Sequence, residues 1–144
     1  MTIPDDFVVP GGHKGPGFRL EPLGPEHNVA DHAAWTSSVE HIRSTPGFPF
    51  GDWPPLKGLS LQENLRDLKQ HAEDFTQRKG FTYTVLDDTD KVIGCVYVYP
   101  SNTGTTHVRS WVTADRKDLD QVLHDTVADW LATRWPFTHV HYRD

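Results

Sequence analysis

Apolar and polar positions divide the chain into short alternating stretches and longer stretches with a helical period. The alternating stretches have the period and the β-branched or aromatic composition of strands, and they are residues 18–23, 81–86, 92–99, 105–112 and 138–142. The acidic turn Asp87-Asp88-Thr89-Asp90 joins two of them, which predicts an antiparallel hairpin. Residues 105–112 then predict a third antiparallel strand, with His107, Arg109 and Trp111 on one face.

The longer stretches predict helices. Ser60 and Glu63 form a capping box, and apolar residues then recur every three or four positions until Gly80 ends the helix. A second apolar stripe covers residues 119–131, and residues 25–42 are compatible with another helix. The stripes and the apolar hairpin strand predict the core, in which we expect Leu65, Leu68, Val96, Val98, Leu123 and Val127.

Proline and glycine interrupt this pattern in two places. Residues 1–16 have no period, which predicts a loose N-terminal arm in front of one domain at 17–144. Residues 43–58 hold too many prolines and glycines for regular structure, yet they display Phe48, Phe50 and Trp53. Such a loop suits the wall of a ligand pocket, although the same rings suit a plug at the end of the core.

Composition narrows the class of protein. The chain has 144 residues, which suits one domain, and its scattered basic residues and net charge of −6 disfavour a nucleic-acid partner. No apolar run approaches the length of a membrane span, and the first residues carry neither a basic leader nor an apolar signal segment. We therefore expect a cytoplasmic protein with no membrane partner, in which Cys95 is a buried and inert thiol.

The order strand, helix, helix, three strands, helix, strand resembles the N-acetyltransferases of the GNAT superfamily. The second hairpin strand, Val92-Ile93-Gly94-Cys95-Val96-Tyr97-Val98-Tyr99, is similar to the family's xxIGxxxxxP pattern. The resemblance covers about residues 18–142 and implies an α+β fold in α/β/α layers, with a mixed, mostly antiparallel central sheet flanked by helices. It also implies an acetyl-CoA-dependent acyltransferase that acts on a small-molecule or protein amine.

In this family the pantetheine of acetyl-CoA lies along the fourth strand, where the fifth strand separates from it, and the pyrophosphate binds a Gly-rich turn that follows. The resemblance places these contacts at Val108, Ser110, Val112, Arg116 and Lys117. The sequence departs from the family because residues 112–120 contain no glycine and three aspartates. The family's C-terminal helix and strands are also missing. These departures keep a second interpretation open, a non-catalytic GNAT-fold binding domain that has lost acetyl-CoA.

Transfer of an acetyl group from a thioester to an amine needs a general base for the amine and a general acid for the leaving thiolate. His107 is the candidate base, since histidine titrates near neutral pH, although a solvent-facing histidine without a catalytic role is the alternative. Tyr142 is the candidate acid, with Tyr97 and Tyr99 as alternatives. For substrate contacts we expect Trp35, Phe50, Trp53 and Tyr99. We expect no metal site, because the sequence fixes no third ligand beside either compatible pair, His139 with His141 or His27 with Asp31, and has no cysteine pair.

The last predicted strand leaves an unpaired sheet edge, which invites pairing with another chain. Val140, Tyr142 and the nearby Trp135-Pro136-Phe137 add apolar surface of the kind enriched in interfaces. We therefore expect a two-fold homodimer in which the C-terminal strand meets its partner. The alternative is a monomer whose N-terminal arm folds over the same edge.

Overall fold

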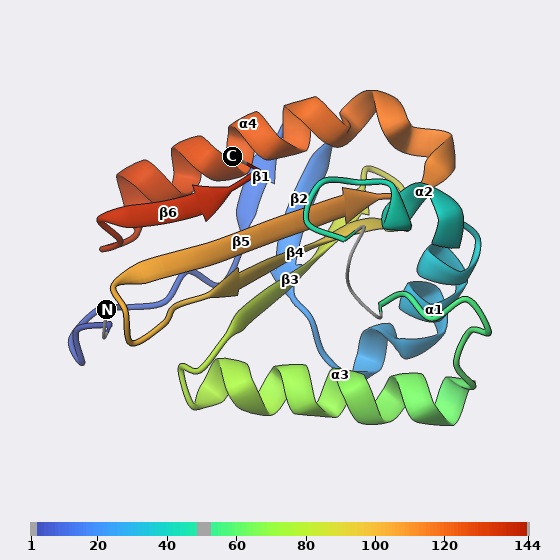
Figure 1. The fold of residues 1–144 in the computed structure, drawn as a ribbon, viewed down its shortest axis with the longest axis horizontal. Helices are drawn as coiled ribbons and strands as arrows, with labels where there is room; N and C mark the ends of the chain where they lie inside the picture. Colours follow the sequence, from blue (N-terminus) through green and yellow to red (C-terminus); the bar gives the residue numbers. More distant parts are fainter. Residues whose placement is uncertain (1–2, 49–52, 144) are drawn as a thin grey trace.

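The computed structural model describes residues 3–48 and 53–143. Its strands form one sheet with the order β1-β2-β3-β4-β5-β6 (Figure 1). The strands are β1 (His13–Gly15), β2 (Phe18–Pro22), β3 (Phe81–Asp87), β4 (Val92–Tyr99), β5 (Thr105–Val112) and β6 (His139–Tyr142). The helices are α1 (Asn28–Thr36), α2 (Val39–Arg43), α3 (Leu61–Thr76) and α4 (Asp120–Arg134), with 3-10 helices η1 (Pro25–His27) and η2 (Ala114–Leu119).

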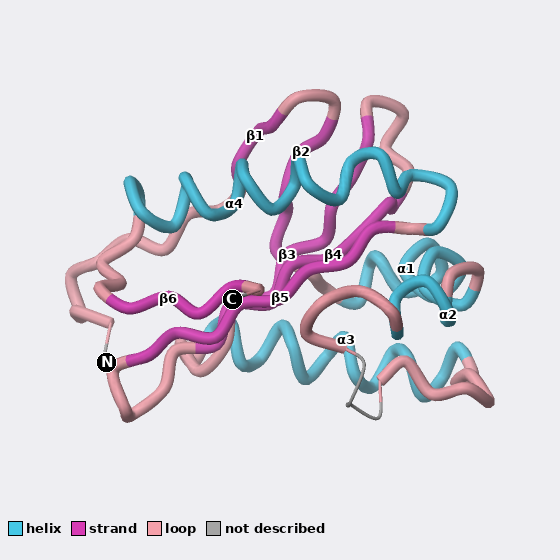
Figure 2. The backbone as a smooth tube through the Cα atoms, turned by 45° about the horizontal axis from the view of Figure 1, so that its top comes forward, coloured by secondary structure: helices cyan, strands magenta, loops and turns pink. Residues whose placement is uncertain are grey.

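Neighbouring strands from β1 to β5 run antiparallel, whereas β5 and β6 run parallel. This sheet lies between α4 on one face and α1 and α3 on the other (Figure 2). The predicted α+β fold, with a mixed and mostly antiparallel sheet between helices, is therefore confirmed. Among the described helices, none combines the length and the apolar composition needed to cross a bilayer.

Two clusters of buried side chains join the helices to the sheet. The α4 cluster contains the predicted core residues Val96, Val98, Leu123 and Val127. The cluster on the other face contains Leu68 of α3, which is 2% exposed, together with Trp111 of β5. These core predictions are confirmed, except that Leu65 is only half-buried because α3 turns Asn64 more fully inward.

Residues 3–16, for which the sequence predicts a loose arm, pack against the rest of the domain in this structure. β1 adds a strand to the edge of β2, and the side chain of Ile3 is buried. The Tyr83 hydroxyl donates a hydrogen bond to the Pro10 carbonyl at 2.6 Å, and Arg78 donates to two arm carbonyls. Contacts with distant residues therefore order a segment that has no period of its own.

The helix predicted at residues 25–42 is divided. The 3-10 helix η1 precedes α1, and Ser37 and Ser38 separate α1 from α2. The Ser37 hydroxyl donates to the Ala34 carbonyl at 2.7 Å, while the Ser38 hydroxyl accepts the backbone N–H of Ala114 at 2.8 Å. The break thus ties the first helices to the turn that follows β5.

Strands β4 and β5 approach closely at Gly94, where a Cβ atom would collide with the Trp111 carbonyl oxygen. On the other side of β5, strand β6 pairs only with Thr105 to Val108. β5 itself continues to Val112. β6 is paired along its whole length and ends at Tyr142, opposite Val108, so in the described part of the chain the second half of β5 has no strand partner on this side. This unpaired half of β5 positions the candidate site.

Candidate functional site

A cavity of about 390 Å³ lies beside the paired strands β5 and β6, near the end of β6. We call it the junction cavity, and its walls include Tyr99, His107, Val108, Arg109, His141 and Arg143. Pro46 and Gly47, in the loop after α2, also line it. The structure thus brings the predicted residues His107, Tyr99 and Val108 to one place.

His107 of β5 lies opposite Tyr99 of β4 in the sheet, and the side chains of both belong to the face that α1 and α3 cover. The His107 ring is exposed, and its centroid lies 5.8 Å from that of His141. Burial raises the pKa of Tyr99, so its hydroxyl stays protonated at neutral pH. A proton acceptor and a proton donor therefore line the same cavity.

Tyr142, the predicted acid, points to the opposite face of the sheet. It lies opposite Val108 rather than His107, because successive side chains of a strand alternate between faces. Its hydroxyl forms a hydrogen bond with the Ser110 hydroxyl, and its ring centroid lies 4.4 Å from that of His124 on α4. Burial raises the pKa of Tyr142 to about 12. The structure therefore places the candidate acid Tyr142 and the candidate base His107 on opposite faces of the sheet.

Within residues 3–48 and 53–143, the predicted cofactor strand has no strand partner on its β6 side beyond Val108. The side chains of Ser110 and Val112 are buried toward α4, so only their backbone is available on that edge. The Ser110 carbonyl accepts a hydrogen bond from Arg143 at 3.2 Å, and the same guanidinium binds both oxygens of Asp120 at 2.6 and 2.7 Å. Arg143 thus occupies the edge along which a pantetheine chain would lie.

The turn after β5 was predicted to hold the pyrophosphate through Arg116 and Lys117. Arg116 Nη1 lies 3.3 Å from Asp87 Oδ2, in an ion pair with the β3–β4 turn, and Lys117 is exposed. The backbone N–H of Ala114 donates to Ser38 rather than pointing to an open site. Arg116 is near a helix start as expected, but its present partner is a carboxylate, and the phosphate contact stays a prediction.

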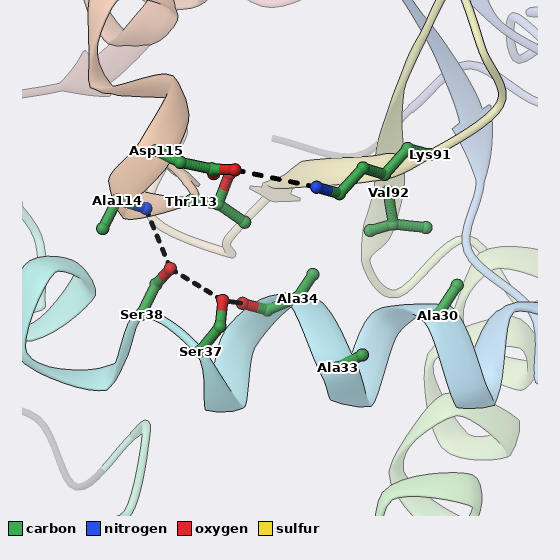
Figure 3. Close-up of a pocket in the computed structure, with 10 residues that line it drawn as sticks. All are labelled: Ala30, Ala33, Ala34, Ser37, Ser38, Lys91, Val92, Thr113, Ala114 and Asp115. Carbon is green, nitrogen blue, oxygen red and sulfur yellow. Dashed lines mark hydrogen bonds and ion pairs between the residues drawn. The ribbon is translucent and has the colours of Figure 1, made fainter.

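A larger cavity of about 540 Å³ lies between α1 and the ends of β4 and β5 (Figure 3). Alanines of α1 form its floor. The charged groups of Lys91 and Asp115 lie 3.6 Å apart in an ion pair on its rim. The charges of Lys91 and Asp115 therefore neutralise each other. None of the sequence-predicted site residues lines this cavity.

A third cavity, of about 180 Å³, lies between α1, α3 and strands β4 and β5. We call it the inner cavity, and its walls include Asp31, Trp53, Asn64, His71, Tyr97 and Arg109. Tyr99 also lines it, so Tyr99 and Arg109 belong to both the inner and the junction cavities. The two cavities therefore adjoin across these two side chains.

The aromatic residues predicted to contact substrate have different positions. Trp53 lines the inner cavity. Trp35 does not, because its side chain is fully buried and its indole N–H donates to Asn64 Oδ1 at 3.0 Å. Trp35 is a core residue in this structure, so its predicted contact with substrate stays a prediction. Phe50 lies outside the described residues.

Two titratable groups of the inner cavity have pKa values shifted by burial. Asp31 is 4% exposed, and burial raises its pKa to about 6, against a hydrogen bond from Asn64 at 3.1 Å that lowers it. Burial lowers the pKa of His71, whose Nδ1 lies 3.1 Å from the Thr82 hydroxyl. His71 is therefore neutral at pH 7 and able to accept a proton.

Sequence reasoning missed Asp31, Asn64 and His71 as cavity residues. Asn64, Leu68 and His71 follow each other at spacings of four and three, so two polar residues interrupt the buried face of α3. That interruption is the signal that could have found them. Across residues 3–48 and 53–143, no group of three or more His, Cys, Asp or Glu side chains is arranged to hold a metal ion.

Comparisons with known proteins place the chain by its fold. No protein-family model matches the sequence, and a search of curated proteins finds no match. The microcin C7 self-immunity acetyltransferase, solved with acetyl-CoA and AMP, gives a TM-score of 0.69 at 12% identity, over 89% of this chain and 68% of its own. RimL, the ribosomal L7/L12 α-N-protein acetyltransferase, gives a TM-score of 0.67 at 12% identity, over 89% of this chain and 71% of its own.

The ribosomal-protein-S5-alanine acetyltransferase of Vibrio fischeri gives a TM-score of 0.66 at 13% identity, over 83% of this chain and 66% of its own. At these identities the likeness shows the fold alone. The chain spans about two-thirds of the length of these three neighbours.

Proposed function

We propose that this chain, which has the fold of the GNAT N-acetyltransferases, transfers an acetyl group from acetyl-CoA to an amine. The observation that carries the proposal is a cavity lined by His107 and Tyr99 beside the half of β5 that, among the described residues, has no strand partner on the β6 side. The free edge of β5 beyond Val108 offers backbone groups to the amides of a pantetheine chain. For that contact Arg143 must leave the Ser110 carbonyl.

Acetyl-CoA supplies the thioester, whose C–S bond breaks as the amide C–N bond forms. In this proposal His107, which lines the cavity, takes the proton that the acceptor nitrogen loses. Tyr99, whose hydroxyl stays protonated because burial raises its pKa, gives a proton to the leaving sulfur in this proposal. Tyr99 therefore replaces Tyr142 as the proposed acid, because it shares a cavity with His107.

The second candidate is a GNAT-fold binding domain without acetyl-CoA. The internal bonds of the turn after β5 favour it, since Ala114 donates to Ser38 and Arg116 pairs with Asp87. For either function we propose a cytoplasmic location, because Cys95 is a buried free thiol and a single cysteine suits a reducing compartment.

Calorimetric titration with acetyl-CoA separates the two candidates. A dissociation constant in the micromolar range, with release of free thiol when amines are added, supports the transferase. No heat at millimolar acetyl-CoA supports the binding domain. If the transferase is correct, His107→Gln and Tyr99→Phe should each lower kcat about 10²–10⁴-fold. His124→Gln, on the far face of the sheet, is the matched histidine control.

A further inference from the structure

We propose that the inner cavity binds the acceptor, and that the acceptor is a small molecule with two basic nitrogens. One nitrogen, as an ammonium group, pairs with Asp31, and the other reaches the thioester beside Tyr99. The inference rests on the proposed acetyltransferase function and adds the class of acceptor to it.

The cavity has a carboxylate end formed by α1 and α3. Asp31 is 4% exposed, and no cation lies within ion-pair distance of it in the described part of the chain. The nearby histidines have other partners, because His32 binds the Leu59 carbonyl at 2.6 Å and His27 lies beside Glu21. Burying a carboxylate without a cation costs free energy, so a cation that binds at this end of the cavity would be stabilised by Asp31.

Asp67 adds a second carboxylate to the same end of the wall. It lies close enough to Asp31 for their charges to repel each other. An ammonium group between two carboxylates relieves that repulsion and replaces the missing counter-ion of Asp31.

Aromatic rings form the middle of the cavity. The centroid of the Tyr97 ring lies 6.2 Å from that of Trp53 and 6.2 Å from that of Tyr99. The Tyr97 hydroxyl accepts the Trp111 indole N–H at 3.1 Å, which fixes the ring. Aromatic faces attract ammonium groups and pack well against methylene chains, so this wall suits an aliphatic amine.

The other end of the cavity carries Arg109. Its guanidinium lies 4.7 Å from the Phe48 ring centroid and 5.3 Å from that of Tyr97. In residues 3–48 and 53–143 it has no carboxylate partner. A positive charge at this point favours the neutral form of a nearby amine, which is the form that attacks a thioester.

These two ends explain why one nitrogen is not enough. An acceptor whose only amine paired with Asp31 would be held away from the junction cavity, which Asp31 does not line. The volume of about 180 Å³ accommodates roughly six to eight non-hydrogen atoms, by comparison with a cavity of about 150 Å³ that holds benzene. A short aliphatic diamine fits both requirements.

The test compares putrescine with butylamine, which has the same carbon chain and one nitrogen fewer. Calorimetry on the protein without acetyl-CoA should show putrescine binding about tenfold or more tightly. Asp31→Asn, which keeps the shape of the side chain, should remove this preference. Asp67→Asn, at a more exposed position, should reduce it, and Asp88→Asn in the β3–β4 turn should leave it unchanged.

Equal binding of the two amines, or a preference that survives in Asp31→Asn, overturns the proposal. Thiol release from acetyl-CoA with other amines but no diamine preference would leave the transferase intact and remove this acceptor class. Binding of putrescine through Asp31 without any binding of acetyl-CoA would support the cation site and overturn the transferase.

Discussion

Asp31 is an aspartate whose properties depend almost entirely on its surroundings. It lies on α1, and α3 and β4 bury it, with the Asn64 amide as its hydrogen-bond donor. One hydrogen bond from the Asn64 amide does not replace the hydration that the carboxylate loses on burial. The pKa of Asp31 therefore rises to about 6. Such a group weakens the fold at neutral pH, which is reasonable for a residue that serves a ligand.

Removing this charge should stabilise the protein. The pKa of an aspartate in the unfolded chain is about 3.8, and that of Asp31 in the fold is about 6. Between about pH 4 and about pH 6 the native state therefore binds more protons at Asp31 than the unfolded state does. Stability therefore falls as pH rises from about 4 to about 6, by about 3 kcal/mol for a shift of about two units. Asp31→Asn should remove most of this loss, as measured by urea unfolding across that range. Asp88→Asn is the control, and parallel pH curves for Asp31→Asn and the unmodified protein would contradict the prediction.

At the scale of elements, the sequence predicts what depends on local period. The stripe of α4 and the three strands after α3 come directly from alternating or helical spacing, and their positions are confirmed. The break between α1 and α2 at Ser37-Ser38 does not come from local spacing, because the Ser38 hydroxyl binds the backbone N–H of Ala114, far along the chain. The pair of Asp31 and Asn64 is likewise formed only when α1 and α3 meet. The candidate site is made of such distant pairs, so the sequence predicted only part of it.

α3 carries one fully buried leucine, and it should dominate the contribution of this helix to stability. Leu68 is 2% exposed and packs in the cluster below β4 and β5. Leu68→Ala should lower the free energy of unfolding by about 2–5 kcal/mol, because it leaves a cavity. Leu61→Ala, at a position 46% exposed, should cost less than about 0.5 kcal/mol. Urea unfolding of both variants checks this, and similar losses would mean that the helix packs differently.

The turn between β5 and α4 offers a test of cofactor binding. If acetyl-CoA binds, Arg116 is expected to exchange Asp87 for a phosphate, since both are anions and the guanidinium is half-exposed. Arg116→Ala should then weaken acetyl-CoA binding by about 1–3 kcal/mol in a calorimetric titration. Arg66→Ala, an exposed guanidinium on α3, controls for the change in net charge. An unchanged titration would remove Arg116 from the site.

At the scale of the whole molecule, the two edges of the sheet differ in which segment forms them. The N-terminal arm adds β1 beside β2, which is the edge opposite β6. The described part of the arm, residues 3–16, therefore forms no strand pair with β6, which the monomer alternative would place under the arm. The apolar surface expected near β6 is smaller than predicted, because Trp135 is buried and stacks on a half-buried Phe137. The backbone edge itself, rather than an aromatic patch, is what remains for a partner.

We expect two copies of the chain to associate through that edge of β6. In the described part of the chain β6 has β5 as its only strand partner, and an open edge presents backbone groups to a second copy. Light scattering at micromolar concentration should give twice the chain mass of 16.3 kDa. His139→Lys places a charge on the exposed edge and should shift the mass toward the monomer, whereas Gln121→Lys on α4 adds the same charge elsewhere and should not. A single mass of 16.3 kDa for the unmodified protein would rule out this dimer.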